Sequence, residues 1–336
     1  MKAIIPVAGI GVTLRPHTHT QPKALVSVAG KPLLSHIVDF LASADIKEFV
    51  FIIGYMGNKI ESFMRSHYSH NDYKMDFVQQ EPRLGSAHAV YCARQFMQPN
   101  DELLIMLGDI LVGMDLKAMV NRSETVVGVK KVKRPIDFGI AELGSNGEVV
   151  KLIEKPKIPK SNLGLVGIYK IRRAADLIQS IEGQLESAPP TKQDFNLTDA
   201  LMEMVVQGEK VTVIEVDNWY DCGSKESLLE ANAKLLKRKG GKADKSIRTS
   251  SGIIIPPVKI GRNCDIRNSI IGPNVVVGDH TAIVNSVVSD SIIGSYSILE
   301  FLMLNNSIIG NDTKLKGMTQ SLNIGDNTEI NFFGDR

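Results

Sequence analysis

Short apolar runs alternate with amphipathic stretches along the first two thirds of the chain. Within 32–44, apolar residues such as Leu34, Ile37 and Leu41 recur three and four positions apart, which is the spacing of one helix face. Continuous apolar runs such as EFVFII and LLIML predict buried strands. In chain order we predict strands at 3–8, 48–53, 75–79 and 103–107, and helices at 32–44, 57–67 and 86–96. This alternation favours a parallel sheet covered by helices on both faces.

A second pattern begins near residue 125, where strand-like runs follow one another more closely. The predicted strands lie at 125–132, 139–143, 149–154, 165–171 and 211–216, and the predicted helices at 174–181, 197–206 and 225–236. The stretch KRKGGKADKSIRTS at 237–250 is polar, basic and glycine-containing. We interpret it as a solvated linker, with an anion-binding patch as the alternative.

The chain after about residue 251 repeats itself. The phrase Ser-Ile-Ile-Gly occurs at 269–272, 291–294 and 307–310, and Leu-Asn-Ile-Gly follows at 322–325. Aliphatic residues also recur six apart, in the sets Ile260 and Ile266; Ile271, Val277 and Ile283; Ile293 and Leu299; Ile309 and Leu315; Ile324 and Ile330. A six-residue period with Gly or Asn at the corners is typical of a parallel β-helix, in which each face contributes one inward aliphatic side chain. We expect roughly four stacked coils.

Composition narrows the class of protein. The 336 residues suggest about two domains, and we place a first domain at 1–237, a linker at 238–252 and a β-helix at 253–336. With 39 Lys and Arg against 37 Asp and Glu, the chain lacks the basic excess of a general nucleic-acid binder. Three scattered cysteines support neither a disulfide framework nor a zinc site. No stretch approaches the ~20 apolar residues of a membrane span or the core of a signal peptide, so we expect a cytoplasmic protein with no membrane partner.

The loop after the first predicted strand carries candidate phosphate ligands. Gly9 and Gly11 follow directly on Ala8, and glycines at such a turn let backbone N–H groups approach a phosphate. Arg15 and Lys23 lie on the same loop, and Lys23 follows a proline. Two cations so placed can neutralise a polyphosphate, whereas a tight turn with surface cations is the alternative.

Carboxylates follow two of the predicted strands. Asp109 comes after the apolar run at 103–107, where open α/β sheets bind ligands, and Asp221 closes a later strand-like run. Two carboxylates at neighbouring strand ends can hold one Mg²⁺ between nucleotide phosphates and a substrate. Glu154 offers an acceptor for hydroxyls and Lys155 a point charge for a monophosphate, with a solvated ion pair as the alternative.

These motifs, taken in order, resemble those of the sugar-nucleotide pyrophosphorylases (nucleoside-diphosphate-sugar nucleotidyltransferases). The resemblance covers roughly residues 1–235, with motifs at 9–13, 22–23, 84–85, 108–109, 154–156, 166–167 and 219–223. It implies an α/β fold: a Rossmann-like nucleotidyltransferase domain with a mixed sheet, followed by a short left-handed parallel β-helix. The opening IIPVAG and the phrase at 221–225 are similar to bacterial glucose-1-phosphate uridylyltransferases, and the tail is similar to the thymidylyl-, adenylyl- and guanylyltransferase branches.

The resemblance also implies a reaction and a set of site residues. An oxygen of a sugar-1-phosphate attacks the α-phosphorus of a nucleoside triphosphate and pyrophosphate leaves, and we expect glucose-1-phosphate with UTP or dTTP. Mg²⁺ is the implied cofactor, held by Asp109 and Asp221. The implied nucleotide-binding residues are Ala8, Gly9, Gly11, Gln80 and Gly85, the implied catalytic residues include Lys23 and Asp109, and Glu154, Lys155 and Gly167 would bind the sugar phosphate.

The signature loop departs from the family pattern. That loop normally reads Gly-x-Gly-Thr-Arg, whereas Val12 and Thr13 stand at its last two positions here. The arginine stabilises the transferring phosphates, and loss of such a charge can cost about 3–4 kcal/mol, by analogy with one preorganised donor. Arg15 lies two residues on and shares a face with Thr13 if the segment is extended, so we expect Arg15 to act in its place as a catalytic residue.

Two other functions stay open at this point. Because of Thr13, the chain can instead be a catalytically weakened regulatory or assembly subunit that binds sugar nucleotides. An acyltransferase built on the β-helix needs a catalytic histidine and more coils, and His280 is the one histidine after residue 88. We therefore interpret the β-helix as a lid and as an interface for a homo-oligomer, since an open stack of coils exposes backbone edges that a partner can cover.

Overall fold

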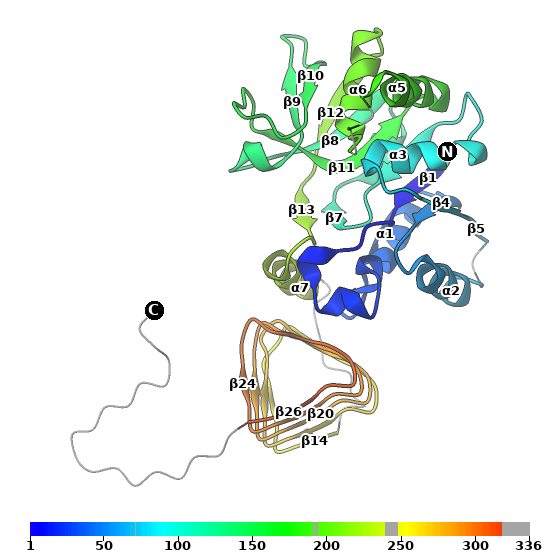
Figure 1. Ribbon diagram of the computed structural model, residues 1–336. Coiled ribbons are helices and arrows are strands. Elements are labelled where there is room, and N and C mark those ends of the chain that lie inside the picture. The colour runs from blue at the N-terminus through cyan, green and yellow to red at the C-terminus, as the bar shows by residue number, and fades with distance from the viewer. Residues whose placement is uncertain (71, 190, 192–193, 239–247, 318–336) are drawn as a thin grey trace. The chain divides into compact units, whose positions relative to one another are not determined.

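The computed structural model describes residues 1–70, 72–189, 191, 194–238 and 248–317, and the chain forms two compact units (Figure 1). The first unit spans Met1–Leu235 and the second Leu236–Arg336. Much of the predicted linker, 238–252, lies outside the described residues, as do the predicted repeat at 322–325 and the aliphatic pair Ile324 and Ile330.

The first unit is built on a nine-stranded mixed sheet. Its strands are β1 (Lys2–Pro6), β4 (Glu48–Ile53), β5 (Lys74–Gln79), β6 (Leu103–Met106), β8 (Thr125–Lys131), β9 (Ile140–Leu143), β10 (Val149–Ile153), β11 (Leu163–Ile171) and β12 (Val211–Glu215). Their order is β10-β9-β11-β6-β1-β4-β5, and β8 pairs with β11 and β12. The strands β6, β1, β4 and β5 are parallel, whereas β11 runs antiparallel to β6 and β8. The predicted parallel region and the mixed sheet are both confirmed.

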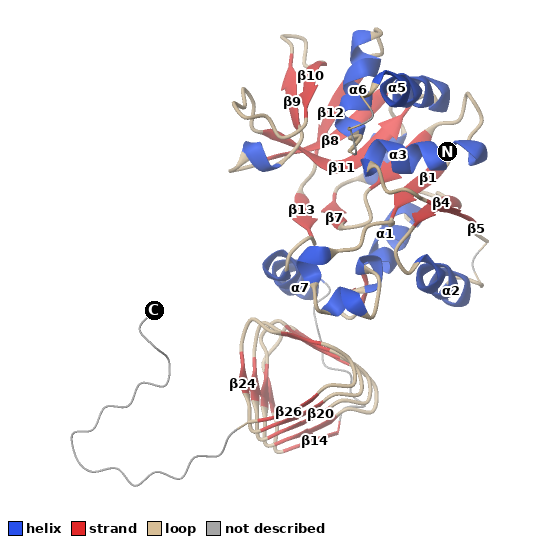
Figure 2. Ribbon diagram, in the orientation of Figure 1, coloured by secondary structure: helices blue, strands red, loops and turns tan. Residues whose placement is uncertain are grey.

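Helices cover both faces of this sheet (Figures 1 and 2). The described α-helices are α1 (Leu33–Ala42), α2 (Gly57–His67), α3 (Gly85–Cys92), α4 (Leu116–Val120), α5 (Ala174–Ser187), α6 (Leu197–Val206) and α7 (Lys225–Arg238). The helices α3, α5 and α6 share one apolar core with the sheet, and Ile4 points into it while its neighbour Ile5 is buried on the other face. The helix predicted at 86–96 is split, because α3 ends at Cys92 and a 3₁₀ turn follows at Arg94–Phe96. None of the described helices has the length and apolar content needed to cross a membrane.

The segment that carries Asp221 differs from the prediction. The strand β12 ends at Glu215, and the chain then forms β13 (Asn218–Asp221), which pairs antiparallel with β7 (Ile110–Gly113) in a small separate sheet. In this register Asp221 pairs with Ile110, the residue after Asp109. The two carboxylates therefore lie side by side because of a short antiparallel pair, and not because two parallel strands end together. A two-stranded hairpin of β2 (Ser27–Val28) and β3 (Lys31–Pro32) completes the strands of this unit.

The second unit is a parallel β-helix with a triangular cross-section (Figure 1). One sheet holds β14 (Arg248–Ser250), β17 (Asp265–Arg267), β20 (Ala282–Val284), β23 (Ile298–Glu300) and β26 (Lys314–Lys316). The second holds β15 (Ile253–Ile254), β18 (Ile270–Ile271), β21 (Val287–Val288) and β24 (Met303–Leu304), and the third β16 (Val258–Ile260), β19 (Val275–Val277), β22 (Ile292–Ile293) and β25 (Ile308–Ile309). Paired residues lie sixteen or seventeen positions apart, so each turn of the chain adds one strand to each sheet.

The six-residue pattern explains this architecture. Ile266, Ile283 and Leu299 pair in register along one inward column, and each is fully buried. The corner residues have positive φ, and asparagine recurs among them because it tolerates the left-handed region. Buried hydroxyls join the coils, as where the backbone N–H of Ser286 donates to Ser269 Oγ at 3.1 Å. The predicted fold, a Rossmann-like domain followed by a left-handed β-helix, is confirmed.

Candidate active site

A cavity of about 340 Å³ lies at the carboxyl ends of β1 and β6. This is the edge at which open α/β sheets bind ligands. Residues that directly follow each strand line the cavity, and so do residues from the segment that leads into α3. The predicted site residues in its wall are Ala8, Gly9, Lys23, Gln80, Gly85 and Asp109. The fold thus brings together most of the residues that we expected to bind a nucleotide.

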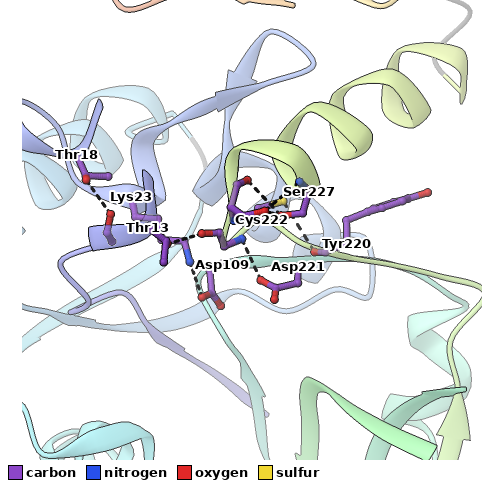
Figure 3. Close-up of polar contacts among 11 residues, drawn as sticks. Thr13, Thr18, Lys23, Asp109, Tyr220, Asp221, Cys222 and Ser227 are labelled. Atoms are coloured by element: carbon purple, nitrogen blue, oxygen red, sulfur yellow. Dashed lines mark hydrogen bonds and ion pairs between the residues drawn. The ribbon is translucent and has the colours of Figure 1, made fainter. Parts of the chain in front are cut away.

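An ion pair lies in the wall of this cavity. The Lys23 Nζ atom is 2.7 Å from Asp109 Oδ2 (Figure 3). The Lys23 side chain is only 14% exposed, so its charge is largely shielded from solvent. Pro22 is extended and Lys23 opens a 3₁₀ turn, which fixes the backbone from which the ammonium reaches the cavity. Lys23 is therefore a positive charge held at the carboxyl end of β6, with Asp109 as its partner.

The glycine loop after β1 is folded onto Lys23. Gly11 has φ +69°, and a Cβ atom at this position would lie 2.9 Å from the Lys23 Cβ. Glycine is therefore needed here both for the left-handed backbone and for the close approach. The hydroxyl of Thr18, which is buried, donates to the Gly11 carbonyl at 2.8 Å and closes the loop (Figure 3). Gly11 does not line the cavity itself, and it contributes by letting the loop pack closely against Lys23.

The loop after β13 places Asp221 beside Asp109. The backbone N–H of Cys222 donates to the Asp109 carbonyl at 2.8 Å, and the backbone N–H of Gly223 donates to Asp221 Oδ1 at 3.0 Å (Figure 3). Desolvation raises the pKa of the Asp221 carboxyl, and the negative charge of Asp109 is the next cause; nearby lysine charges partly offset both. Two carboxylates that disfavour each other's charge in this way are suited to a divalent cation.

The described residues supply no cluster of three or more carboxylate, histidine or cysteine ligands. A Mg²⁺ ion held by Asp109 and Asp221 would thus take its other oxygens from a ligand or from water. That is the common arrangement for Mg²⁺ at phosphate sites, which keeps several waters and uses few protein ligands. The residues present fit the implied ion.

Gln80 and Gly85, which also line the first cavity, form a fixed pair. Gly85 has φ +92°, and a Cβ atom there would lie 2.6 Å from the backbone nitrogen of Phe195. Gln80 is buried, and its Nε2 donates to the Gly85 carbonyl at 2.9 Å and lies 3.3 Å from His88 Nδ1. Burial lowers the pKa of His88, which favours the neutral imidazole that can accept this contact. Both amide hydrogens of Gln80 are engaged, which leaves its Oε1 as the group available to a ligand.

A second cavity of about 230 Å³ lies next to the first. Its lining contains the remaining predicted site residues, Glu154, Lys155 and Gly167, together with both aspartates, Asp109 and Asp221. Glu154 Oε2 accepts a hydrogen bond from Thr198 Oγ1 at 2.7 Å, which orients the carboxylate. Asp109 lines both cavities, so ligands bound in the two would meet at this carboxylate.

The segment that carries Thr13 and Arg15 is not extended. Val12–Leu14 forms a 3₁₀ turn, in which residues two apart point in different directions. Thr13 Oγ1 donates to the Gly223 carbonyl and so links the glycine loop to the loop after β13 (Figure 3). Arg15 is exposed and lines neither cavity. The geometric reason for expecting Arg15 to act in place of the signature arginine therefore does not hold, and its role stays a prediction.

Sequence reasoning missed several lining residues. Thr198 lies in α6 at a position that its amphipathic spacing assigns only to the core, and nothing there indicates a partner for Glu154. Phe138 and Trp219 form an edge-to-face pair, with ring centroids 4.9 Å apart, in the wall of the second cavity. Arg83 lines the first cavity, and its place between the predicted Gln80 and Gly85 was the signal that could have revealed it.

Comparisons with known proteins agree with this geometry. A model of the family described as nucleotidyl transferase matches residues 2–238. The chain belongs to this family. It is 30% identical to a glucose-1-phosphate thymidylyltransferase of Streptomyces antibioticus, with 96% of this chain and 94% of the relative aligned.

Other relatives and a solved structure match about 70–76% of the chain. The low-salt glycan biosynthesis nucleotidyltransferase Agl11 of Haloferax volcanii is 33% identical over 73% of this chain and 70% of the relative. The bifunctional protein GlmU of Methanococcus maripaludis is 31% identical over 76% of this chain, which spans 60% of that longer relative. A solved structure described as a glucose-1-phosphate thymidylyltransferase of Bacillus anthracis superposes with a TM-score of 0.60 at 28% identity, covering 70% of this chain and 94% of the other.

Proposed function

We propose that the protein couples a sugar-1-phosphate, specifically glucose-1-phosphate, with UTP or dTTP to give a nucleoside-diphosphate sugar and pyrophosphate. The observation that carries the proposal is the pair of adjoining cavities that share Asp109. The first cavity has the glycine loop, Lys23 and the amide oxygen of Gln80. The second has the carboxylate of Glu154, Lys155 and the aromatic pair of Phe138 and Trp219. Two ligands of different chemistry are thereby held against one carboxylate. The thymidylyltransferase that aligns over nearly the whole chain supports the same reaction.

In the proposed reaction an oxygen of the sugar-1-phosphate forms a bond to the α-phosphorus of the triphosphate. The bond from that phosphorus to the bridging oxygen breaks, and pyrophosphate leaves with the electron pair. Lys23 stabilises the charge of the transferring phosphates from one side, and Lys155 binds the incoming phosphate from the other. Glu154 accepts hydrogen bonds from hydroxyls of the sugar, and the backbone at Gly167 packs against its ring. Because no covalent enzyme intermediate is needed, positioning and charge neutralisation supply the rate enhancement.

Asp109 and Asp221 would hold the Mg²⁺. When bound, the ion supplies charge neutralisation between the phosphates of the two substrates. The carboxylates themselves set the position of Lys23, through the ion pair with Asp109, and of the loop after β13. Because the pKa of Asp221 is raised, its ionised form is less favourable in the metal-free fold than in water, and a bound cation would offset this cost.

The fixed orientation of Gln80 supports a choice of base. Its Nε2 is committed to Gly85 and His88, so Oε1 faces the ligand as an acceptor. Uracil and thymine present a ring N–H at N3 and guanine presents one at N1, whereas adenine and cytosine offer only an exocyclic amino donor on the pairing edge. A fixed acceptor therefore suits UTP or dTTP, and discrimination against the other bases must come from other groups in the cavity wall.

A second candidate function rests on Thr13. The Thr13 hydroxyl donates to the Gly223 carbonyl, and Thr13 itself stands at the loop position where the family pattern has an arginine. A chain that binds both ligands but transfers slowly would act as a regulatory or assembly subunit. The two candidates differ in turnover and agree in binding.

The test is pyrophosphate release with a panel of nucleoside triphosphates against sugar-1-phosphates, in the presence of Mg²⁺. We expect release with UTP or dTTP and glucose-1-phosphate, and loss of at least ~100-fold in Asp221→Asn. Asp217→Asn is the matched control, because Asp217 lies four residues earlier, is exposed and lines neither cavity. Binding of both ligands without release by any pair would favour the regulatory subunit.

A further inference from the structure

Two cations line the first cavity within the described part of the chain, and they differ in their surroundings. Lys23 already pairs with Asp109 at 2.7 Å, which cancels much of its charge before any ligand arrives. The guanidinium of Arg83 forms no ion pair or hydrogen bond with a described residue, and Arg83 is exposed at the cavity rim. Arg83 is therefore the uncompensated positive charge on this wall.

A bound nucleoside triphosphate needs more positive charge than Lys23 can offer. The triphosphate carries close to four negative charges at neutral pH, whereas the Lys23–Asp109 pair is nearly neutral. The arginine of the family's signature loop is Thr13 in this chain, and its hydroxyl is bonded to Gly223. Arg15 is outside the lining. Mg²⁺ would neutralise part of the triphosphate charge, and Arg83 is the other cation in the described wall of the same cavity.

The backbone around Arg83 favours an anion at this wall. Arg83 lies directly before α3, whose first residues, Gly85 and Ser86, also line the cavity. No side chain caps the N-terminus of α3, but the Ala87 N–H of its first turn already donates to the Phe195 carbonyl at 2.8 Å, so the helix end adds only part of its positive charge to that of the guanidinium. Gln80 at the other end of this turn is buried and doubly hydrogen-bonded, which keeps the turn in place. A cavity of about 340 Å³ lies within the size range of small-molecule sites, and Lys23 and Arg83 both line it.

We propose that Arg83 is a phosphate-binding residue that provides the positive charge missing from the altered signature loop. Its planar fork of N–H donors suits bidentate binding of phosphate oxygens. The inference rests on the proposed function, because it assumes that the first cavity takes a nucleoside triphosphate. It assigns to the segment before α3 a task that the signature loop usually performs.

The test is direct binding of UTP, dTTP and the corresponding nucleosides to the full-length protein by calorimetry. Arg83→Ala weakens triphosphate binding by about 10- to 100-fold and leaves nucleoside binding within about twofold, because the nucleoside lacks the phosphates. Arg83→Lys recovers part of the lost affinity, because it keeps the charge and loses the bidentate fork. Arg65→Ala, which removes an exposed arginine of α2 paired with Glu61, is the matched control and leaves both affinities unchanged.

Salt dependence gives a second readout that a structural role would not change. Raising the ionic strength weakens triphosphate binding to the wild-type protein, and this slope is shallower in Arg83→Ala because one charge contact is gone. The Arg15→Ala variant compares the two arginines directly, and its triphosphate affinity falls less than that of Arg83→Ala.

Three results would overturn the inference. The first is triphosphate affinity in Arg83→Ala within twofold of wild type. The second is an equal loss for nucleoside and triphosphate, which would make Arg83 a base-stacking or folding residue. The third is an Arg83→Lys variant as weak as Arg83→Ala. If the wild-type protein itself binds no nucleotide, the proposed function fails as well, whereas normal wild-type turnover with an unaffected Arg83→Ala contradicts only this inference.

Discussion

Gly85 tests whether the wall of the nucleotide cavity is as tightly built as the structure indicates. Its φ of +92° would strain any L-residue, and a Cβ atom there would lie 2.3 Å from Asp194 Oδ1 and 2.6 Å from the backbone N and O of Phe195. The Asp194 carboxylate is the end of a flexible side chain and can move aside. The Phe195 backbone cannot, because it donates to the Leu84 carbonyl at 2.9 Å and accepts from the Ala87 N–H at 2.8 Å.

A second glycine separates strain from overlap. Gly208, after α6, also has φ +92°, and no atom lies within 4 Å of its Cβ position. Gly208→Ala therefore lowers the free energy of unfolding by the backbone strain alone, about 1–2 kcal/mol. Gly85→Ala carries the same strain and an overlap of about 1–3 kcal/mol, for a total of about 2–5 kcal/mol. The difference between the two variants isolates the contact with Phe195.

The assay is urea unfolding followed by tryptophan fluorescence. Trp219 is the one tryptophan of the chain and belongs to the first unit, so the signal reports that unit. In parallel, Gly85→Ala weakens nucleoside binding, because the Gly85 carbonyl that fixes the amide of Gln80 is displaced, whereas Gly208→Ala does not. Equal loss of stability in the two variants, within about 0.5 kcal/mol, would refute the tight approach at Gly85.

Three further predictions use other parts of the structure. Because the pKa of Asp221 is raised in the fold, Asp221→Asn stabilises the metal-free protein at pH 7. In thermal melts this gain in stability vanishes as the pH falls, because the wild-type carboxyl becomes protonated. A gain that grows in acid would contradict the raised pKa. Ile283→Ala, in the inward column of the β-helix, lowers the stability of the second unit by about 2–5 kcal/mol in circular dichroism melts. The outward-facing control Ile298→Ala changes that stability by less than about 0.5 kcal/mol. Similar losses in the two variants would argue against an inward Ile283. Lys23→Met lowers kcat/KM for the triphosphate by about 100-fold or more, and unchanged steady-state kinetics would remove Lys23 from the phosphate site.

Much of the architecture could be predicted because burial leaves a periodic trace. The helices at 57–67 and 197–206 have the predicted bounds, since each carries an apolar stripe at helical spacing. The inward column of the β-helix through Ile266 and Ile283 follows from the six-residue period, which reflects one side chain per face of each coil. Periodicity of this kind depends only on local geometry and on which face meets the core.

The parts that could not be predicted depend on long-range pairing or on tight turns. The strands β7 and β13 are four residues each and are more than a hundred positions apart, so neither carries a period that identifies its partner. The 3₁₀ turn at Val12–Leu14 is too short for any pattern, so the condition that the segment be extended, on which the substitution by Arg15 depended, could not be checked from the sequence and is not met. Arg83 lies between two predicted site residues in the sequence, but its place in one cavity wall with the loops after β1 and β6 follows only from the fold. The order of the motifs could identify the site, but it could not show which charged side chains lie next to one another, such as Lys23 and Asp109.

The central claim is that two ligands react across Asp109, and ³¹P NMR of the full-length protein with Mg²⁺, glucose-1-phosphate and UTP or dTTP tests it most directly. We predict that the α-phosphorus signal of the triphosphate is replaced by that of a nucleoside-diphosphate glucose, with pyrophosphate formed in equal amount. Adding pyrophosphate to the product should regenerate both substrates, because the bond made and the bond broken are nearly equivalent. Release of inorganic phosphate, or binding of both ligands with no new phosphorus signal, would contradict the claim.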